Sequence, residues 1–119
     1  MVKIRREGVV LAPTKRKFES LSVFNPGIIQ DGDNVHVLYR AIDDNYLSTF
    51  GYAKLKGPTE VAERWKKPFA EPKYKYESKG IEDPRITRIG DTMYVTYVAH
   101  DGRNAVIALS DGILRRMTL

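Results

Sequence analysis

Apolar and polar residues alternate along much of the chain with the two-residue period of β-strands. Short polar turns and loops separate these stretches, so neighbouring stretches are expected to pair as antiparallel hairpins. No segment keeps a helical period over three turns, although residues 59–67 could form two helical turns between Pro58 and Pro68. The pattern predicts an all-β fold of antiparallel sheets. The predicted strands are NVHVLYRAI (34–42), TFGYAKL (49–55), TMYVTYVAH (92–100) and NAVIALS (104–110).

The segment between the second and third predicted strands has a different character. Residues 66–84, KKPFAEPKYKYESKGIEDP, contain three prolines and many charges. This composition predicts an extended connection rather than a core element. Long ordered loops are often functional, so the segment is a candidate for carrying part of a site.

Two parts of the chain repeat each other. Residues 25–44, NPGIIQDGDNVHVLYRAIDD, align without a gap on residues 83–102, DPRITRIGDTMYVTYVAHDG, with eight identities in twenty positions and an offset of 58. Each copy comprises a short strand, a Gly-Asp turn, a long strand, a polar loop and a further strand. Tandem antiparallel sheet units of about this length suit the blades of a β-propeller. A duplicated hairpin within an ordinary β-sandwich is the alternative.

We therefore expect one partial propeller domain over residues 1–119, with blade-like units at about 20–58 and 78–112. Equivalent positions of successive blades converge on the propeller axis, so Asn25-Pro26 should face Asp83-Pro84. Two blades leave open sheet edges, which predicts a homo-oligomer or association with a missing second chain.

Composition narrows the functional classes. The 119 residues include no cysteine and only two histidines, so we expect neither disulfides nor a metal site. The net charge is +5, but the basic residues are scattered and have no aromatic platform among them, so nucleic acid is not the expected partner. No apolar run is long enough for a membrane span, and the N-terminus has no signal-peptide core. A cytoplasmic location without membrane association is expected.

The segment GIEDPRITRIG (80–90) carries the strongest candidate chemistry. Asp83 precedes a proline, which should hold its backbone in the extended region and so fix its carboxylate. The alternative is a turn-capping aspartate paired with Arg85. Arg40 interrupts an apolar strand at the position where the second copy has Val98, which indicates a side chain facing a ligand or, equally, solvent.

The two histidines carry weaker signals. His36 alternates with Val35 and Val37 and is expected on the outward face of its strand. His100 lies at a strand end beside Asp101 and could reach a ligand.

Three segments together resemble glycoside hydrolase family 130, which contains the β-mannoside phosphorylases and some related mannosidases. They are VFNPGIIQDGDNVHVLYRA, STFGYAKL and YESKGIEDPRITRIGDTMYVTYVAHDG, in the order and at about the spacing of the family. The relatives fold as five-bladed β-propellers, so the resemblance implies that this chain contains about two blades. It also implies that residues for binding phosphate lie in later blades.

The resemblance implies roles for individual residues. Asp83 would be the catalytic proton donor, and Asn25 and Arg40 would line the sugar subsite, with Glu82 and Arg85 as further substrate-binding candidates. The implied reaction is inverting phosphorolysis of a β-mannoside oligosaccharide, with inorganic phosphate as cosubstrate and no other cofactor. The alternative is a non-catalytic, β-rich module that oligomerises or binds sugar.

Overall fold

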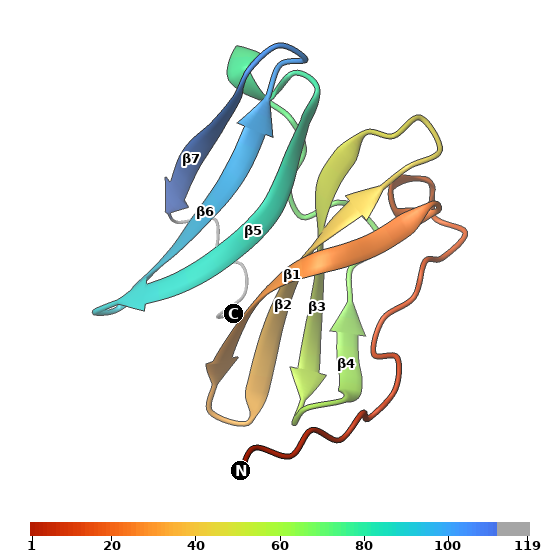
Figure 1. Ribbon diagram of the computed structural model, residues 1–119, viewed down its shortest axis with the longest axis vertical. Coiled ribbons are helices and arrows are strands. Elements are labelled where there is room, and N and C mark those ends of the chain that lie inside the picture. The colour runs from red at the N-terminus through yellow and green to blue at the C-terminus, as the bar shows by residue number, and fades with distance from the viewer. Residues whose placement is uncertain (112–119) are drawn as a thin grey trace.

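The computed structural model describes residues 1–111, in which seven strands form two antiparallel sheets (Figure 1). The all-β prediction is confirmed. Two 3-10 helices, η1 (Lys17–Glu19) and η2 (Lys75–Glu77), precede the two sheets in the chain. Sheet 1 has the order β1 (Ser22–Asp31), β2 (Asn34–Ile42), β3 (Ser48–Lys56) and β4 (Glu60–Arg64), and sheet 2 the order β5 (Gly80–Ile89), β6 (Thr92–His100) and β7 (Ala105–Asp111).

Two local expectations need correction. Residues 60–64 form a strand rather than helical turns, because their backbone pairs with β3 through Leu55↔Val61 and Ala53↔Arg64. The connection after β4 is also more than an extended linker. It contains η2 and the start of β5, and Phe69 is buried in the core. No helix in residues 1–111 is long and apolar enough to cross a membrane.

The main core lies between the two sheets. Strand β1 of sheet 1 lies next to β5 of sheet 2 (Figure 1). Alternation along each strand sends every second side chain into the layer between the sheets, which excludes water from one face of each sheet. The buried members of this core are Leu38, Phe50, Tyr52, Phe69, Ile81, Met93 and Val95.

A second apolar cluster covers the opposite face of sheet 1, which we call its outer face. Its buried members are Val37, Tyr39, Ala41, Ala53 and Leu55. Leu11 and Phe18, from the segment before β1, pack against it. Sheet 1 is therefore apolar on both faces, as expected for an inner layer of a multi-sheet fold.

The repeat includes more residues than the twenty aligned positions. Glu19 in η1 and Glu77 in η2 are related by the same offset as the aligned positions, and each is buried. The Tyr39 hydroxyl donates to Glu19 Oε1 at 2.6 Å, and the Tyr97 hydroxyl donates to Glu77 Oε2 in the same way. Burial, with the nearby carboxylate, raises the pKa of both phenols, so both stay protonated donors. Each sheet is thus tied to the helix before it by a hydrogen bond from a tyrosine to a buried glutamate.

The prediction for His36 is wrong. Its side chain does point away from Val35 and Val37, but that face of β2 is covered by sheet 2, and His36 is only 2% exposed. Its Nδ1 lies 2.8 Å from the Tyr52 hydroxyl, and its Nε2 lies 3.9 Å from Asp31 Oδ2. Burial lowers the pKa of His36; the Asp31 carboxylate opposes this shift, while Lys54 and Arg88 add to it.

This shift predicts how stability depends on pH. As pH falls below about 6.5, the unfolded chain protonates His36 before the folded chain does. The free energy of unfolding should therefore decrease with falling pH, by up to about 1.4 kcal/mol per pH unit. Urea unfolding between about pH 7 and pH 5.5 measures this slope. A His36→Gln variant should show a shallower slope, and an unchanged slope would exclude His36 as its source.

Candidate functional site

The candidate site forms where β1 and β5 approach each other. Gly27 makes this approach possible, because a Cβ at this position would lie 2.5 Å from the Pro84 carbonyl oxygen. The pairing of β1 with β2 shifts between Phe24 and Gly27, and the pairing of β5 with β6 shifts between Glu82 and Arg85. Each sheet thus carries a β-bulge at the same place in the repeat. Bulges of this kind redirect side chains away from the regular alternation of a strand.

The bulges correct the expectation for Asp83. Its φ is 52°, and that of the equivalent Asn25 is 46°, so neither residue is in the extended region that a following proline favours. Asn and Asp tolerate positive φ better than other side chains, which explains why these two types occupy the bulges. Strained backbone at matched positions is typical of functional sites.

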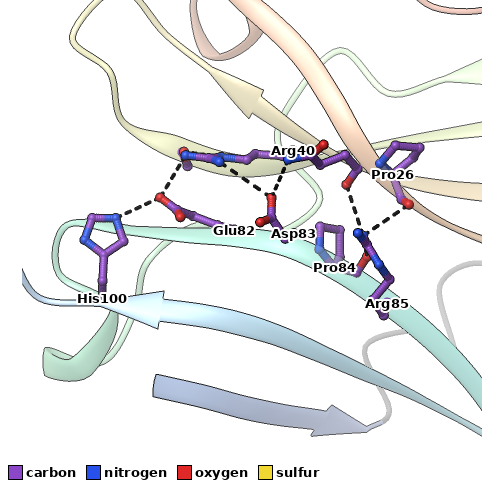
Figure 2. Close-up of polar contacts among 9 residues, drawn as sticks. Pro26, Arg40, Glu82, Asp83, Pro84, Arg85 and His100 are labelled. Atoms are coloured by element: carbon purple, nitrogen blue, oxygen red, sulfur yellow. Dashed lines mark hydrogen bonds and ion pairs between the residues drawn. The ribbon is translucent and has the colours of Figure 1, made fainter. Parts of the chain in front are cut away.

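The bulges bring Asn25, Arg40 and Asp83 together, and Figure 2 shows Arg40 beside Asp83. Asn25 Nδ2 donates to Asp83 Oδ1 at 3.0 Å, and Arg40 Nη1 lies 3.5 Å from the same oxygen. Within residues 1–111, the other carboxylate oxygen, Oδ2, has no hydrogen bond or ion pair. The Asp83 side chain is 35% exposed. One oxygen is therefore held in place, while the other has no partner among the described residues.

Arg40 is fixed from several sides. Its guanidinium lies over the Phe24 ring, 4.8 Å from the centroid, and its Nε donates to Ser48 Oγ at 2.9 Å. Its Nη2 donates to Glu82 Oε2 at 2.9 Å, while Nη1 lies near Asp83. These contacts hold a cation between two adjacent carboxylates.

His100 is the neighbour on the other side of Glu82. Its Nε2 lies 3.0 Å from Glu82 Oε2, so Glu82 bridges the imidazole and Arg40 (Figure 2). Gly80 leaves room for this ring, since a Cβ there would lie 3.0 Å from His100 Nε2. His100, for which the sequence indicated ligand contact only weakly, therefore lies beside the site.

Arg85 behaves differently from Arg40. Its guanidinium donates to the carbonyl oxygens of Pro84 at 2.7 Å, Pro26 at 3.3 Å and Asn25 at 3.5 Å. Figure 2 shows it against the prolines rather than beside the Asp83 carboxylate. Arg85 thus links the two bulges through their backbones, and the alternative of a turn aspartate paired with Arg85 is not what the structure shows.

The site presents the Asp83 carboxylate among polar and charged side chains. Residues 1–111 contain no group of three or more His, Cys, Asp or Glu side chains that could hold a metal ion. The open Asp83 oxygen can give or accept a proton, and the Asn25 and Arg40 donors suit hydroxyl-rich ligands.

Comparison with known proteins identifies the family. The family model described as β-1,4-mannooligosaccharide phosphorylase matches residues 3–112. The chain belongs to glycoside hydrolase family 130. A family member of known structure superposes with a TM-score of 0.81 at 25% identity, over 91% of this chain and 37% of that protein. That structure was described in work on family 130 hydrolases that target β-1,2 mannosidic linkages in Candida mannan. The predicted partial five-bladed propeller is confirmed, with the two sheets as blades.

Two characterised relatives come from Thermoanaerobacter sp. (strain X514). A β-1,2-mannobiose phosphorylase is 31% identical over 109 residues, covering 80% of this chain and 36% of the relative. A 1,2-β-oligomannan phosphorylase is 31% identical over 113 residues, covering 87% of this chain and 38% of the relative. The chain therefore spans little more than a third of the length of these family 130 enzymes.

Proposed function

We propose that this chain contributes the proton-donating part of a family 130 active site that cleaves β-mannosides by phosphorolysis. The observation that carries the proposal is the Asp83 carboxylate, held through Oδ1 by Asn25 and Arg40 while Oδ2 stays open. A general acid needs a fixed position and access to the leaving group, and this arrangement offers both.

In the proposed reaction, Asp83 starts protonated on Oδ2. The bond between the anomeric carbon and the glycosidic oxygen breaks, and the leaving oxygen receives the proton of Asp83 through a mannose hydroxyl. An oxygen of inorganic phosphate bonds to the anomeric carbon from the opposite face. The products are α-mannose 1-phosphate, with inverted configuration, and the shortened saccharide or free sugar.

Glu82 itself is not suited to be the base of an inverting hydrolase. An inverting hydrolase needs a second carboxylate as base, about 6.5–9.5 Å from the acid with room for a water molecule. Glu82 directly precedes Asp83 in the sequence, and its Oε2 is already bound by Arg40 at 2.9 Å and by His100 at 3.0 Å. A carboxylate engaged in this way is a poor base, whereas phosphate is itself an anionic nucleophile and needs none.

Arg40 and Asn25 are proposed to contact the mannose unit. The Arg40 side chain is 18% exposed. Its guanidinium lies between two carboxylates, with Nη1 3.5 Å from Asp83 Oδ1. Glu82 is proposed to orient Arg40 rather than to bind sugar, and Arg85 to hold the two bulges together. The phosphate cradle is proposed to lie in blades beyond the two described here.

Hydrolysis is the second candidate, because a structurally similar family member comes from work on family 130 hydrolases. An assay with β-1,4- and β-1,2-mannobiose, with and without phosphate, separates the two. We expect mannose 1-phosphate only when phosphate is present. Release of free mannose at the same rate without phosphate would establish hydrolysis instead. Saccharide binding without any product, when the phosphate-binding blades are also present, would favour a sugar-binding module.

A further inference from the structure

His100 is the first member of a row of side chains that ends at Asp83. Its ring nitrogen Nε2 lies 3.0 Å from Glu82 Oε2, and Arg40 Nη2 donates to the same oxygen at 2.9 Å. Arg40 Nη1 in turn lies 3.5 Å from Asp83 Oδ1 (Figure 2). An imidazole, a carboxylate, a guanidinium and a second carboxylate thus follow one another, and each contacts the next.

The repeat shows that this row is not part of the packing that the two sheets share. Arg40, Glu82 and His100 each stand where the other copy has an apolar residue, at the offset of 58. Their side chains are only 18%, 21% and 28% exposed. Partly buried polar groups are costly unless they are paired, so three such exchanges that contact one another indicate a role beyond folding. The apolar counterparts are Val98, Phe24 and Ile42.

The fold holds the His100 ring against Glu82. His100 pairs with Gly80 across β5 and β6, and a Cβ on Gly80 would lie 3.0 Å from His100 Nε2. Gly80 also has a φ of 143°, which favours glycine for a second reason. The carbonyl oxygen of His100 accepts from the Lys79 backbone amide at 2.9 Å. The residues just before Glu82 therefore place both the ring and the backbone of His100.

Glu82 must share one oxygen between two cations whenever His100 is protonated. A neutral ring leaves the carboxylate charge to Arg40 alone, whereas an imidazolium competes with Arg40 for Oε2. Arg40 is also held by Ser48 Oγ and by the Phe24 ring, and neither of these groups changes charge with pH. Protonation of His100 should therefore move the guanidinium end of Arg40 without releasing the whole side chain.

The other charged groups around His100 come from the segments beside β6. Lys79 precedes β5, and Asp101 and Arg103 lie in the loop after β6. Asp101 Oδ1 accepts from two backbone amides of this loop, at 2.8 and 2.9 Å. These bonds hold the pKa of Asp101 below its usual range, and the charge of His100 acts in the same direction. Asp101 is thus engaged by its own loop, and Glu82 is the carboxylate within ion-pair distance of the ring.

We propose that His100 is a positioning residue of the Asp83 site, which acts through Glu82 on the guanidinium of Arg40. When His100 is neutral, Glu82 holds Arg40 more strongly. When His100 is protonated, Arg40 is freer to approach Asp83. The coupling itself does not depend on the reaction, but its consequence for catalysis rests on the proposed function. In that reaction, the positive charge presented to the proton donor varies with pH.

An NMR titration of the 119-residue chain tests this coupling from about pH 8 to about pH 5, where histidine side chains ordinarily change charge. The Nε–H of Arg40 and the backbone amide of Asp83 should each show a step in chemical shift, with the same midpoint as the His100 ring carbon Cε1. His100→Gln should remove the step from both groups. His36→Gln is the matched control, because it removes the other histidine, which is buried beside Tyr52, and it should leave the step in place.

Glu82→Gln separates a route through Glu82 from a direct effect of charge through space. The amide keeps an oxygen for Arg40 Nη2 but has no charge to share, so His100 should still titrate while the step at Arg40 becomes much smaller. The proposal would be overturned by a His100 ring that titrates without a step at Arg40 or does not titrate at all. A step that survives His100→Gln, stays complete in Glu82→Gln or disappears in His36→Gln would also overturn it.

This measurement does not require the chain to be active. A complete active site that failed to cleave mannosides would refute the proposed function and leave the coupling between His100 and Arg40 standing. Loss of the coupling in an active enzyme would refute only the role of His100.

Discussion

Replacing Asp83 with Asn is expected to reduce phosphorolysis of β-mannobiose by the complete active site, phosphate-binding blades included, by about 10²- to 10⁴-fold, the usual loss when a general acid is removed. The amide keeps an oxygen that can accept the hydrogen bond from Asn25 Nδ2, so the position of the side chain is preserved. It has no acidic proton to donate. Binding of mannobiose should therefore change little, and kcat should fall far more than KM rises. Steady-state kinetics with phosphate in excess measures both.

A substrate with a better leaving group separates proton donation from a structural role. The nitrophenolate of 4-nitrophenyl β-mannoside departs without protonation, so Asp83→Asn should lose much less activity on it. Asp91→Asn makes the same chemical change in an exposed turn between β5 and β6 and should keep wild-type rates. Equal losses on both substrates would show that Asp83 positions other groups and does not donate the proton.

Glu19→Ala is expected to lower the free energy of unfolding by about 3–5 kcal/mol, as when one partner of a buried ion pair is removed. Glu19 is fully buried and joins three parts of the chain. Its Oε2 accepts from Thr14 Oγ1 at 2.6 Å and lies 3.1 Å from Arg64 Nη2, and its Oε1 accepts from Tyr39. Removal leaves the buried Tyr39 phenol without its acceptor and the mostly buried Arg64 guanidinium without its counter-charge, although Arg64 Nη2 still donates to the Ala12 carbonyl oxygen at 2.8 Å. The loss is a large share of the roughly 5–15 kcal/mol of a typical domain.

Denaturant unfolding measures this loss, with two comparison variants. Glu19→Gln keeps an acceptor for Tyr39 but removes the charge that faces Arg64, so its loss should be intermediate. Glu7→Ala removes an exposed carboxylate paired with Arg5 at 2.7 Å and should shift stability by less than about 1 kcal/mol. If Glu19→Ala were as stable as Glu7→Ala, the buried cluster would contribute nothing to holding η1 against sheet 1.

Much of the fold could be predicted from periodicity and the repeat. The strands at 34–42 and 92–100 have the predicted bounds, because alternation and flanking turns define both ends. The position of His36 could not be predicted in this way. Alternation gives the face of a strand on which a residue lies, but only the packing of a second sheet determines whether that face is buried.

The candidate site could also be predicted only in part. The repeat placed Asn25 and Asp83 at equivalent positions, and the structure brings them within 3.0 Å. Local rules for residues before proline suggested extended backbone, whereas the bulges impose positive φ at both residues. Bulges depend on strand pairing across the sheet, which a single sequence does not record.

One available signal was missed. The tetrapeptides KFES (17–20) and KYES (75–78) are related by the same offset as the repeat, and they carry the buried Glu19 and Glu77. Their inclusion would have extended the repeat to the helix before each sheet. A buried glutamate next to an aromatic residue is hard to recognise from composition alone, because most glutamates are exposed.

The most direct test of a shared sugar pocket is an NMR titration of the 119-residue chain with β-mannobiose. The side-chain amide of Asn25, the Nε–H of Arg40 and the backbone amide of Asp83 should shift together and saturate with one dissociation constant. Asp83→Asn should keep that binding. Shifts confined to other surfaces, with these three groups unmoved at saturating saccharide, would contradict a sugar pocket formed by the bulges of β1 and β5.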